Sequence, residues 1–206
     1  MKRVKAWVVF LLLLLMTGMP AFSFKTIQFD FENGIEGWEI PDWAAEQKDC
    51  VGLDYGVTTE KAFSGDRSMK VDTNFPGTAW TAAVIEYAKD IDLSGYSKIK
   101  ARIYIPKESN NQQMFGRIIL TAGPWFFIEM KEPIQLKTGS WTTIEAKLDV
   151  SRLGELSYWK CVDANTCLLD NLKKVKRIAV RVEYNASFQS GPPYKGPVYI
   201  DDITID

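Results

Sequence analysis

The sequence predicts an all-β protein that folds as a β-sandwich of the jelly-roll type. Short segments of alternating apolar and polar residues recur along the chain with turn residues between them, a pattern typical of antiparallel strands. No convincing long helix and no internal repeat is visible in the sequence. The first and last strand patterns, Thr26 to Trp38 and Pro197 to Asp206, are expected to pair with each other. About ten antiparallel strands joined in this way favour a jelly roll over an immunoglobulin-like sandwich.

Residues 1–23 are predicted to be a secretory signal peptide. Three basic residues precede a continuous apolar run from Trp7 to Met16, which is too short for a membrane span. Small residues before Phe24 supply a cleavage site. Residues 24–206 then form a single domain of 183 residues. We expect a secreted or periplasmic protein with no membrane insertion after cleavage.

Composition excludes several classes of function. Without the three basic residues of the leader, 22 basic residues face 26 acidic ones, a net charge of −4, so nucleic acid is not an expected partner. Histidine is absent, which removes Ser-His-Asp and Cys-His catalysis and most zinc chemistry. Export allows a disulfide, and Cys161 with Cys167 would close a short loop. Cys50 is then a lone thiol, unless it pairs with one of the other two instead.

The first half of the chain alternates strand patterns with turns. Val51 to Val57 and Ser68 to Asp72 are predicted strands, and residues 61–66 (KAFSGD) form a turn between them. Residues 74–78 (NFPGT) break the pattern. Trp80 to Tyr87 is predicted to be a longer strand.

The second half contains the clearest alternation. Every second residue between Lys98 and Ile105 is apolar, so this strand is expected to have one buried face. Residues 151–172 are the least strand-like segment and are interpreted as a long loop, with a helical turn at 170–174. The other predicted strands of this half, apart from the last, are Phe115–Leu120, Trp125–Met130, Trp141–Leu148 and Arg177–Tyr184.

The last strand carries two adjacent carboxylates, Asp201 and Asp202, in an apolar context. Because strand side chains alternate, Asp201 is expected to share a face with Ile203 and Ile205. An unpaired carboxylate on that face would be costly. We therefore expect a bound cation to compensate Asp201.

Calcium is the cation that this sequence favours. Calcium takes several oxygen ligands and mixes carboxylates with backbone carbonyls. Asp30 and Glu32 on the first strand and Asp201 on the last supply carboxylates, and the turn around Ser64 and Gly65 offers carbonyls. We predict a structural Ca²⁺ at this place; the alternative is that these acids are ordinary solvated residues at strand ends.

Six tryptophans lie outside the leader. Trp38 and Trp141 lie beside strand patterns and are predicted to pack in the core or at its rim. Burying the other four in a domain of this size would be difficult. Exposed indole rings stack on flat apolar surfaces, and the faces of pyranose rings are such surfaces. The four candidates for an exposed ring are Trp43, which opens an acidic connection interpreted as a loop, Trp80, Trp125 and Trp159.

Two other classes of function remain open from the residues alone. A periplasmic or envelope structural protein would use exposed aromatics for protein–protein contact, and it would show a flat apolar patch. A glycosidase needs two acids at a set separation in a cleft. Glu86, Glu129 and Glu145 are candidates for such acids, but no compact Glu-x-Asp-x-x-Glu pattern occurs. We therefore do not expect an enzyme.

Several motifs resemble those of jelly-roll carbohydrate-binding modules with a galactose-binding-like fold. Within that superfamily, the spacing of Trp43, Trp80 and Trp125 is most similar to the mannan-binding modules of family 27. The motifs occur in the same order and are FDFENGIEGW (29–38), KAFSGDRSMKV (61–71), IDLSGYSKIKARIYIP (91–106), LKTGSWTTIEAKLD (136–149) and VYIDDITI (198–205).

The resemblance implies a non-catalytic module that binds β-mannan or glucomannan. It implies that the three tryptophans line a groove on one sheet and stack on the sugars, and that the structural calcium lies at Glu32, the Ser64–Gly65 turn and Asp201. It also implies polar partners near the groove, for which Arg117, Glu129 and Gln113 are predicted from their positions. A separate glycoside hydrolase or an envelope protein is a candidate second partner.

Overall fold

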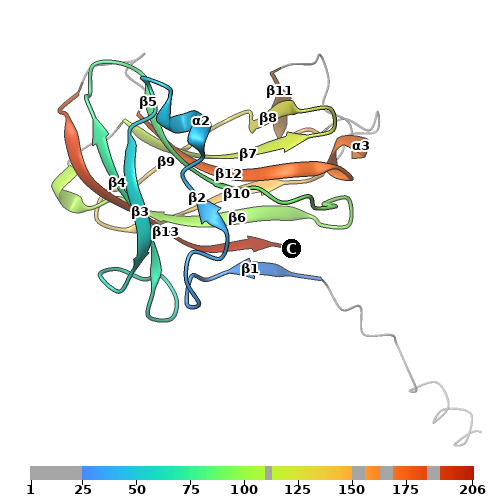
Figure 1. Ribbon diagram of the computed structural model, residues 1–206, viewed down its shortest axis with the longest axis horizontal. Helices are drawn as coiled ribbons and strands as arrows, with labels where there is room; N and C mark the ends of the chain where they lie inside the picture. The colour runs from blue at the N-terminus through green and yellow to red at the C-terminus, as the bar shows by residue number, and fades with distance from the viewer. Residues whose placement is uncertain (1–24, 110–112, 150–155, 163–168, 185–190) are drawn as a thin grey trace, which may run out of the picture.

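The computed structural model describes residues 25–109, 113–149, 156–162, 169–184 and 191–206, so the predicted leader lies outside it. Two antiparallel sheets stack as a β-sandwich, which confirms the predicted fold class (Figure 1). The first sheet has six strands in the order β10-β6-β13-β4-β3, with β1 also paired to β13. These strands are β1 (Ile27–Phe29), β3 (Gly52–Thr58), β4 (Ser68–Phe75), β6 (Lys98–Tyr104), β10 (Trp141–Lys147) and β13 (Tyr194–Ile205).

The second sheet has seven strands in the order β11-β8-β7-β12-β5-β2, with β9 also paired to β7. These strands are β2 (Trp38–Glu39), β5 (Thr81–Tyr87), β7 (Met114–Ala122), β8 (Phe126–Met130), β9 (Ile134–Gln135), β11 (Trp159–Cys161) and β12 (Val175–Tyr184). Three short helices complete the described chain: α2 (Asp42–Ala45), η2 (Lys107–Ser109) and α3 (Leu169–Leu172). In this part of the chain, no helix is long and apolar enough to cross a membrane.

The predicted pairing of the first and last strands is confirmed. β1 runs antiparallel to β13, with Ile27 opposite Ile205 and Phe29 opposite Ile203. The pairing brings the two ends of the described chain together and places the apolar residues of both strands against the core. Such closure is what distinguishes this arrangement from a sandwich whose terminal strands lie apart.

The core lies between the two sheets and follows the predicted alternation. Ile99, Ala101 and Ile103 are fully buried on β6, and their neighbours in sequence point outward. Trp38 is also fully buried and packs edge-to-face on Phe29, with ring centroids 5.4 Å apart. The predicted core role of Trp38 is therefore confirmed.

Two elements occur where loops were expected. The acidic connection after Trp38 forms the short helix α2, which begins after the extended residue Pro41 and buries Ala44. The segment interpreted as a long loop contains β11, which pairs with β8. Trp159 anchors this strand to the core, because its side chain is buried and its Nε1 donates a hydrogen bond of 2.7 Å to the Lys147 carbonyl. Trp159 is thus a core residue.

The last strand contains a bulge that changes which residues face the core. Asp202 has φ 46°, and the register of β13 against β6 shifts between Asp201 and Thr204. Ile200 before the bulge and Ile203 after it both belong to the core. A bulge adds one residue and so reverses the alternation beyond it. The prediction that Asp201 shares a face with Ile203 is therefore wrong: Asp201 lies on the outer side of the sheet.

Candidate functional site

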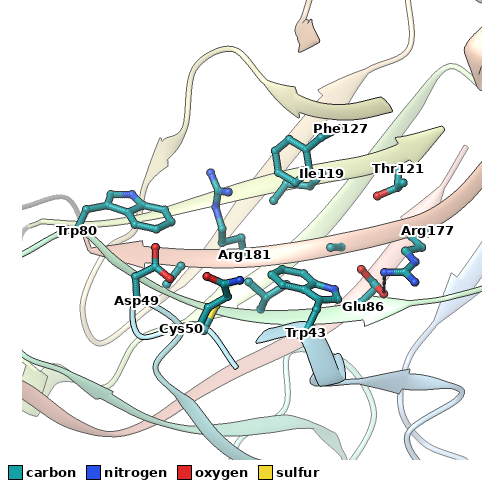
Figure 2. A pocket seen from close by; sticks show the side chains of 14 residues that line it. Trp43, Asp49, Cys50, Trp80, Glu86, Ile119, Thr121, Phe127, Arg177 and Arg181 are labelled. Carbon is teal, nitrogen blue, oxygen red and sulfur yellow. Dashed lines mark ion pairs between the residues drawn. The ribbon is translucent and has the colours of Figure 1, made fainter. Parts of the chain in front are cut away.

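The outer face of the seven-stranded sheet carries a groove of about 400 Å³ (Figure 2). Its floor is a small apolar cluster made of Ala82, Val84, Ala179 and Ile119, with Phe127 packed beside it. These residues occupy the outward positions of four neighbouring strands, because the alternate positions face the core. Small side chains in the middle of the sheet keep the floor low.

Two tryptophans border this floor, and both were predicted from the sequence. Trp43 comes from α2 and Trp80 from the residue before β5, and their exposed fractions are 38% and 37%. The guanidinium of Arg181 lies 5.4 Å from the Trp80 ring centroid, a cation–π distance. The groove therefore combines an apolar floor with two partly exposed indole rings (Figure 2).

A buried carboxylate holds one side of the groove. Glu86 pairs with Arg177 at 3.3 Å and receives a hydrogen bond from the Trp43 side chain. Burial raises the pKa of Glu86, while Arg177 and Trp43 act in the opposite direction. The Glu86 carboxylate thus fixes both an arginine and an indole ring at the rim.

The shifted Glu86 predicts a pH dependence. A carboxyl group whose pKa is raised by folding contributes stability when protonated and loses that contribution as pH rises through the window above 4.5. We expect the wild-type melting temperature minus that of Glu86→Gln to be more positive at pH 4.5 than at pH 7. Thermal melts of both proteins at the two pH values check this, and a difference of the opposite sign contradicts the assignment.

The third predicted tryptophan, Trp125, lies beyond the groove on the turn between β7 and β8. Its ring is 58% exposed. Arg177 links it to the groove, because the Arg177 guanidinium lies 5.3 Å from the Trp125 ring centroid and also pairs with Glu86. Trp43, Trp80 and Trp125 therefore lie along the same outer sheet face, with only the first two lining the groove itself.

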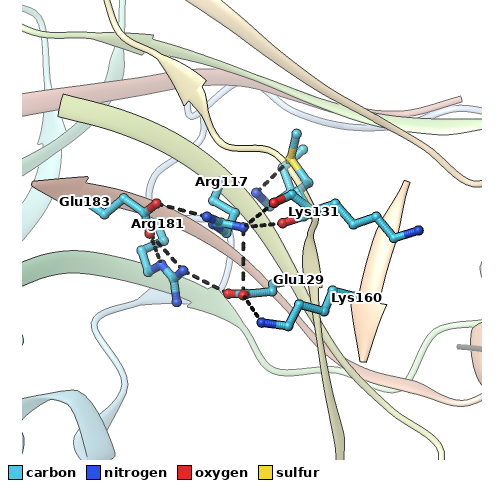
Figure 3. A network of polar contacts seen from close by, with 8 residues as sticks. Arg117, Glu129, Lys131, Lys160, Arg181 and Glu183 are labelled. Carbon is cyan, nitrogen blue, oxygen red and sulfur yellow. Dashed lines mark hydrogen bonds and ion pairs between the residues drawn. The ribbon is translucent and has the colours of Figure 1, made fainter. Parts of the chain in front are cut away.

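A closed ring of four alternating charges lies beside the groove (Figure 3). Glu183 pairs with Arg117 at 3.2 Å and with Arg181 at 2.8 Å. Glu129 pairs with Arg181 at 2.9 Å and with Arg117 at 3.8 Å. All four side chains are largely buried, and Arg117 also donates hydrogen bonds to the backbone carbonyls of β8 and the residue after it. The ring therefore fixes Arg181, the member that lines the groove.

The polar residues predicted from the sequence do not line the groove. Arg117 and Glu129 belong to the charged ring and reach the groove only through Arg181, and Gln113 lies before β7. The lining instead uses Arg177 and Arg181, which sequence reasoning missed. Their signal was present in the sequence, because both occupy outward positions of the predicted strand Arg177–Tyr184, on which the apolar residues Ile178, Val180 and Val182 alternate inward.

The family described as mannanase, galactose-binding domain-like matches residues 29–202. The chain belongs to this family. No curated protein sequence matches the chain.

Three solved structures with the same fold as this galactose-binding-like chain are carbohydrate-binding modules. CBM27-1 of Caldicellulosiruptor saccharolyticus, solved in complex with mannohexaose, has a TM-score of 0.58 at 15% identity and covers 88% of this chain and 96% of its own. The family 11 module of the Clostridium thermocellum cellulase Lic26A-Cel5E has a TM-score of 0.52 at 16% identity, over 88% and 94%. CBM28, described as specific for non-crystalline cellulose, has a TM-score of 0.54 at 12% identity, over 86% and 91%. At these identities the likeness shows the fold.

The acids considered for catalysis do not form a pair in this galactose-binding-like domain. Glu86 and Glu129 lie in one row across β5, β12, β7 and β8, with Ala179 and Ile119 between them. Three strand spacings separate them by roughly 14 Å, whereas glycosidase carboxylates lie about 5–9.5 Å apart. Glu145 lies on the other sheet. The arrangement does not fit glycoside hydrolysis by these three residues.

The buried carboxylate of Asp201 is compensated by backbone donors. It accepts hydrogen bonds from the N–H groups of Phe63 at 2.7 Å, Ser64 at 3.2 Å and Asp202 at 2.7 Å. Burial raises the pKa of Asp201, and these three donors oppose that shift. The compensation expected from a cation is thus supplied, at least in part, by three backbone N–H groups.

The other predicted calcium ligands lie around the same turn. Glu32 accepts hydrogen bonds from the N–H groups of Asp66 and Arg67, at 2.9 and 2.8 Å, and its carboxylate packs against Gly65. Asp30 accepts one from the N–H of Glu32. Across the described residues, no three acidic or cysteine side chains converge closely enough to hold a metal ion. Carboxylate oxygens such as these are ligands that calcium prefers, but a calcium ion at this turn would need backbone carbonyl ligands as well.

The cysteines lie in different settings. Cys50 is a free thiol that lines the groove, and burial raises its pKa. Cys161 is disulfide-bonded. Cys167 lies outside the described residues, so its pairing with Cys161 stays a prediction.

Proposed function

We propose that this chain binds a β-linked polysaccharide, β-mannan or glucomannan in the first place, and that it does so without catalysis. The observation that carries the proposal is the row of three exposed tryptophans along one sheet face, two of them bordering an apolar groove. Membership of a family named for mannanases supports mannan, and so does the likeness to a module solved with mannohexaose.

The chemistry of the groove suits a chain of pyranose rings. Each sugar ring has an apolar face that stacks on an indole ring and equatorial hydroxyls that need hydrogen-bond partners. Arg177, Arg181 and Glu86 offer such partners around the apolar floor, together with Gln47 and Asp49. Because the groove is open to water, the dissociation constant is expected to be micromolar to sub-millimolar, about −5 to −8 kcal/mol.

A structural protein that uses this face for protein contact is the second candidate. A flat apolar patch would favour it. The tryptophans here border a hollow that is rimmed by charged side chains, and this favours a hydroxyl-rich ligand.

The test is affinity electrophoresis of the mature protein in gels that contain soluble glucomannan, galactomannan, xylan, mixed-linkage β-glucan or a cellulose derivative. Retardation by the two mannans is expected. If no polymer retards a folded sample with calcium present, polysaccharide binding is contradicted and the structural-protein alternative is favoured.

We also propose the structural calcium predicted from the sequence, at the turn between Glu32 and Asp201. A ligand present at about 100 times its dissociation constant stabilises a protein by about 2.7 kcal/mol, or about 5–11 °C for a domain of this size. Chelation with EDTA is therefore expected to lower the melting temperature by several degrees, and Ca²⁺ should restore it. An unchanged melting temperature would show that the backbone donors suffice.

Export to the periplasm or outside the cell, and action beside a separate glycoside hydrolase or envelope protein, are part of the same proposal. A mannan-binding module has its ligand in plant or microbial polysaccharide. Cell fractionation tests the location directly.

A further inference from the structure

The turn that carries Trp125 holds an exposed indole ring in an uncommon backbone conformation. Trp125 has φ 75°, in the left-handed region that residues other than glycine rarely adopt, and Gly123 at φ 58° begins the same turn. Such strain persists only where the surrounding structure enforces it, and it is common at binding sites. The Gly123 N–H anchors the turn through a hydrogen bond of 2.9 Å to the Lys174 carbonyl, next to β12.

A bulge at the start of β12 turns two cations toward this ring. The register against β7 shifts between Val175 and Arg177, so Lys176 is the extra residue. In a regular strand, Lys176 and Arg177 would point to opposite faces. Here the Lys176 ammonium lies 4.5 Å and the Arg177 guanidinium 5.3 Å from the Trp125 ring centroid. A bulge re-aims side chains in this way.

The two cations differ in whether their charge is already matched. Arg177 pairs with Glu86. Within the part of the chain that the structure describes, Lys176 has no carboxylate at ion-pair distance, nor has the neighbouring Lys174; Lys173, in contrast, pairs with Asp170 at 2.8 Å. Lys176, whose ammonium lies over the exposed ring, and Lys174, two residues before it, are therefore left for a ligand.

Two open hollows, of about 360 and 710 Å³, lie beside the turn that carries Trp125, and both are lined by Gly123, Lys173, Lys174 and Lys176. Asp90 and Asp92 also line the smaller hollow, and Asp170, which pairs with Lys173, lines the larger one. Asp92 already accepts hydrogen bonds from the N–H and the hydroxyl of Ser94, at 2.9 and 2.6 Å. There is thus space for a group that is larger than a single ion next to the two lysines.

We propose that this cationic end, formed by Trp125, Lys174 and Lys176, takes an acidic sugar residue, a uronate whose ring stacks on Trp125 and whose carboxylate pairs with the lysines. The inference rests on the proposed polysaccharide binding and adds a preference within it, for chains that carry uronic acid residues. A neutral sugar that stacks where Lys176 lies displaces the ammonium from the ring and gives it no new partner. A uronate supplies that partner.

The test compares two forms of one polymer by titration calorimetry: soluble glucomannan, and the same glucomannan after partial oxidation of its C6 hydroxyls to carboxylates. The wild type is expected to bind the oxidised form about threefold to fivefold more tightly at low ionic strength, as befits a surface ion pair. The preference should vanish near 0.5 M salt, where screening is strong. Lys176→Gln is expected to weaken the preference, and Lys174→Gln combined with Lys176→Gln to abolish it, with unchanged melting temperatures.

Lys147→Gln is the matched control, because the Lys147 ammonium lies 5.5 Å from the Tyr158 ring centroid, in a similar cation–aromatic contact away from Trp125. It should keep the preference. Equal binding of both polymers by the wild type contradicts the uronate site but not mannan binding. A preference that survives Lys174→Gln combined with Lys176→Gln contradicts the uronate site in the same way. If the wild type binds only the oxidised polymer, the cationic end stands and the mannan proposal falls; binding of neither overturns both.

Discussion

Trp80→Ala is expected to lower the affinity for mannan about 30-fold or more with little change in stability. Tryptophan anchors at binding sites cost about 2 kcal/mol or more on truncation, and about 1.4 kcal/mol corresponds to a factor of ten. The Trp80 ring is 37% exposed and lies at the groove edge with one face near Arg181, so little core packing is lost. Trp80 is a cleaner choice than Trp43, because removing Trp43 also removes a hydrogen bond to Glu86.

Trp141→Ala provides the control for this measurement. Trp141 is also partly exposed, but it lies on the six-stranded sheet, where it packs edge-to-face on Phe63 and contacts Tyr104. We expect this variant to keep the wild-type affinity in calorimetric titration with glucomannan and to lose a few degrees of melting temperature. Unchanged affinity in Trp80→Ala, measured on a folded sample, removes stacking at the groove from the proposed mechanism. A large drop in melting temperature instead makes Trp80 a packing residue.

The sequence was informative wherever a property depends on local alternation. The buried face of β6 and the inward face of β12 follow from apolar residues at every second position. The pairing of β1 with β13 was also predictable, since both ends carry strand patterns. These features share a period of two that is visible without knowing the partner strand.

Features that depend on register or on positive φ were not predictable. Asp202 and Lys176 each create a bulge, and nothing in the surrounding apolar pattern marks either position. The bulge at Asp202 places Asp201 and Ile203 on opposite faces of the sheet. The bulge at Lys176 brings the lysine over Trp125. A bulge is set by the partner strand and by the turn beyond it, which are distant in sequence.

The contacts of the polar residues in the charged ring also depend on strand register and could not be predicted from the sequence. Arg117 and Glu129 were expected to contact sugar because they lie on predicted strands near the tryptophans. Their charges are instead matched by Arg181 and Glu183 across three neighbouring strands, β8, β7 and β12. Only the register of these strands determines that the four side chains meet. The ring thus positions Arg181 at the groove while withdrawing its other members from it.

Glu183→Ala is expected to cause the largest loss of stability among single changes beside the groove. The Glu183 side chain is 2% exposed and pairs with both arginines of the ring. Removing one partner of a buried ion pair costs about 3–5 kcal/mol, because the remaining charges stay desolvated. Glu129 would then be the one carboxylate of the ring for both arginines. A loss of about 3 kcal/mol corresponds to a fall in melting temperature of about 6–12 °C.

Thermal melts at neutral pH check this expectation, with Glu145→Ala as the matched control. Glu145 is also an outward-facing strand glutamate, but its partner Lys98 lies 4.0 Å away and both side chains are about a third exposed. Exposed pairs of this kind contribute about 1 kcal/mol or less, so the control should melt within about 2–4 °C of the wild type. Mannan affinity of Glu183→Ala, measured well below its melting temperature, should also fall, because Arg181 loses the carboxylate that fixes it beside Trp80. Equal melting temperatures for the two variants would mean that Glu129 alone balances both arginines, and that the ring positions Arg181 without stabilising the sheet.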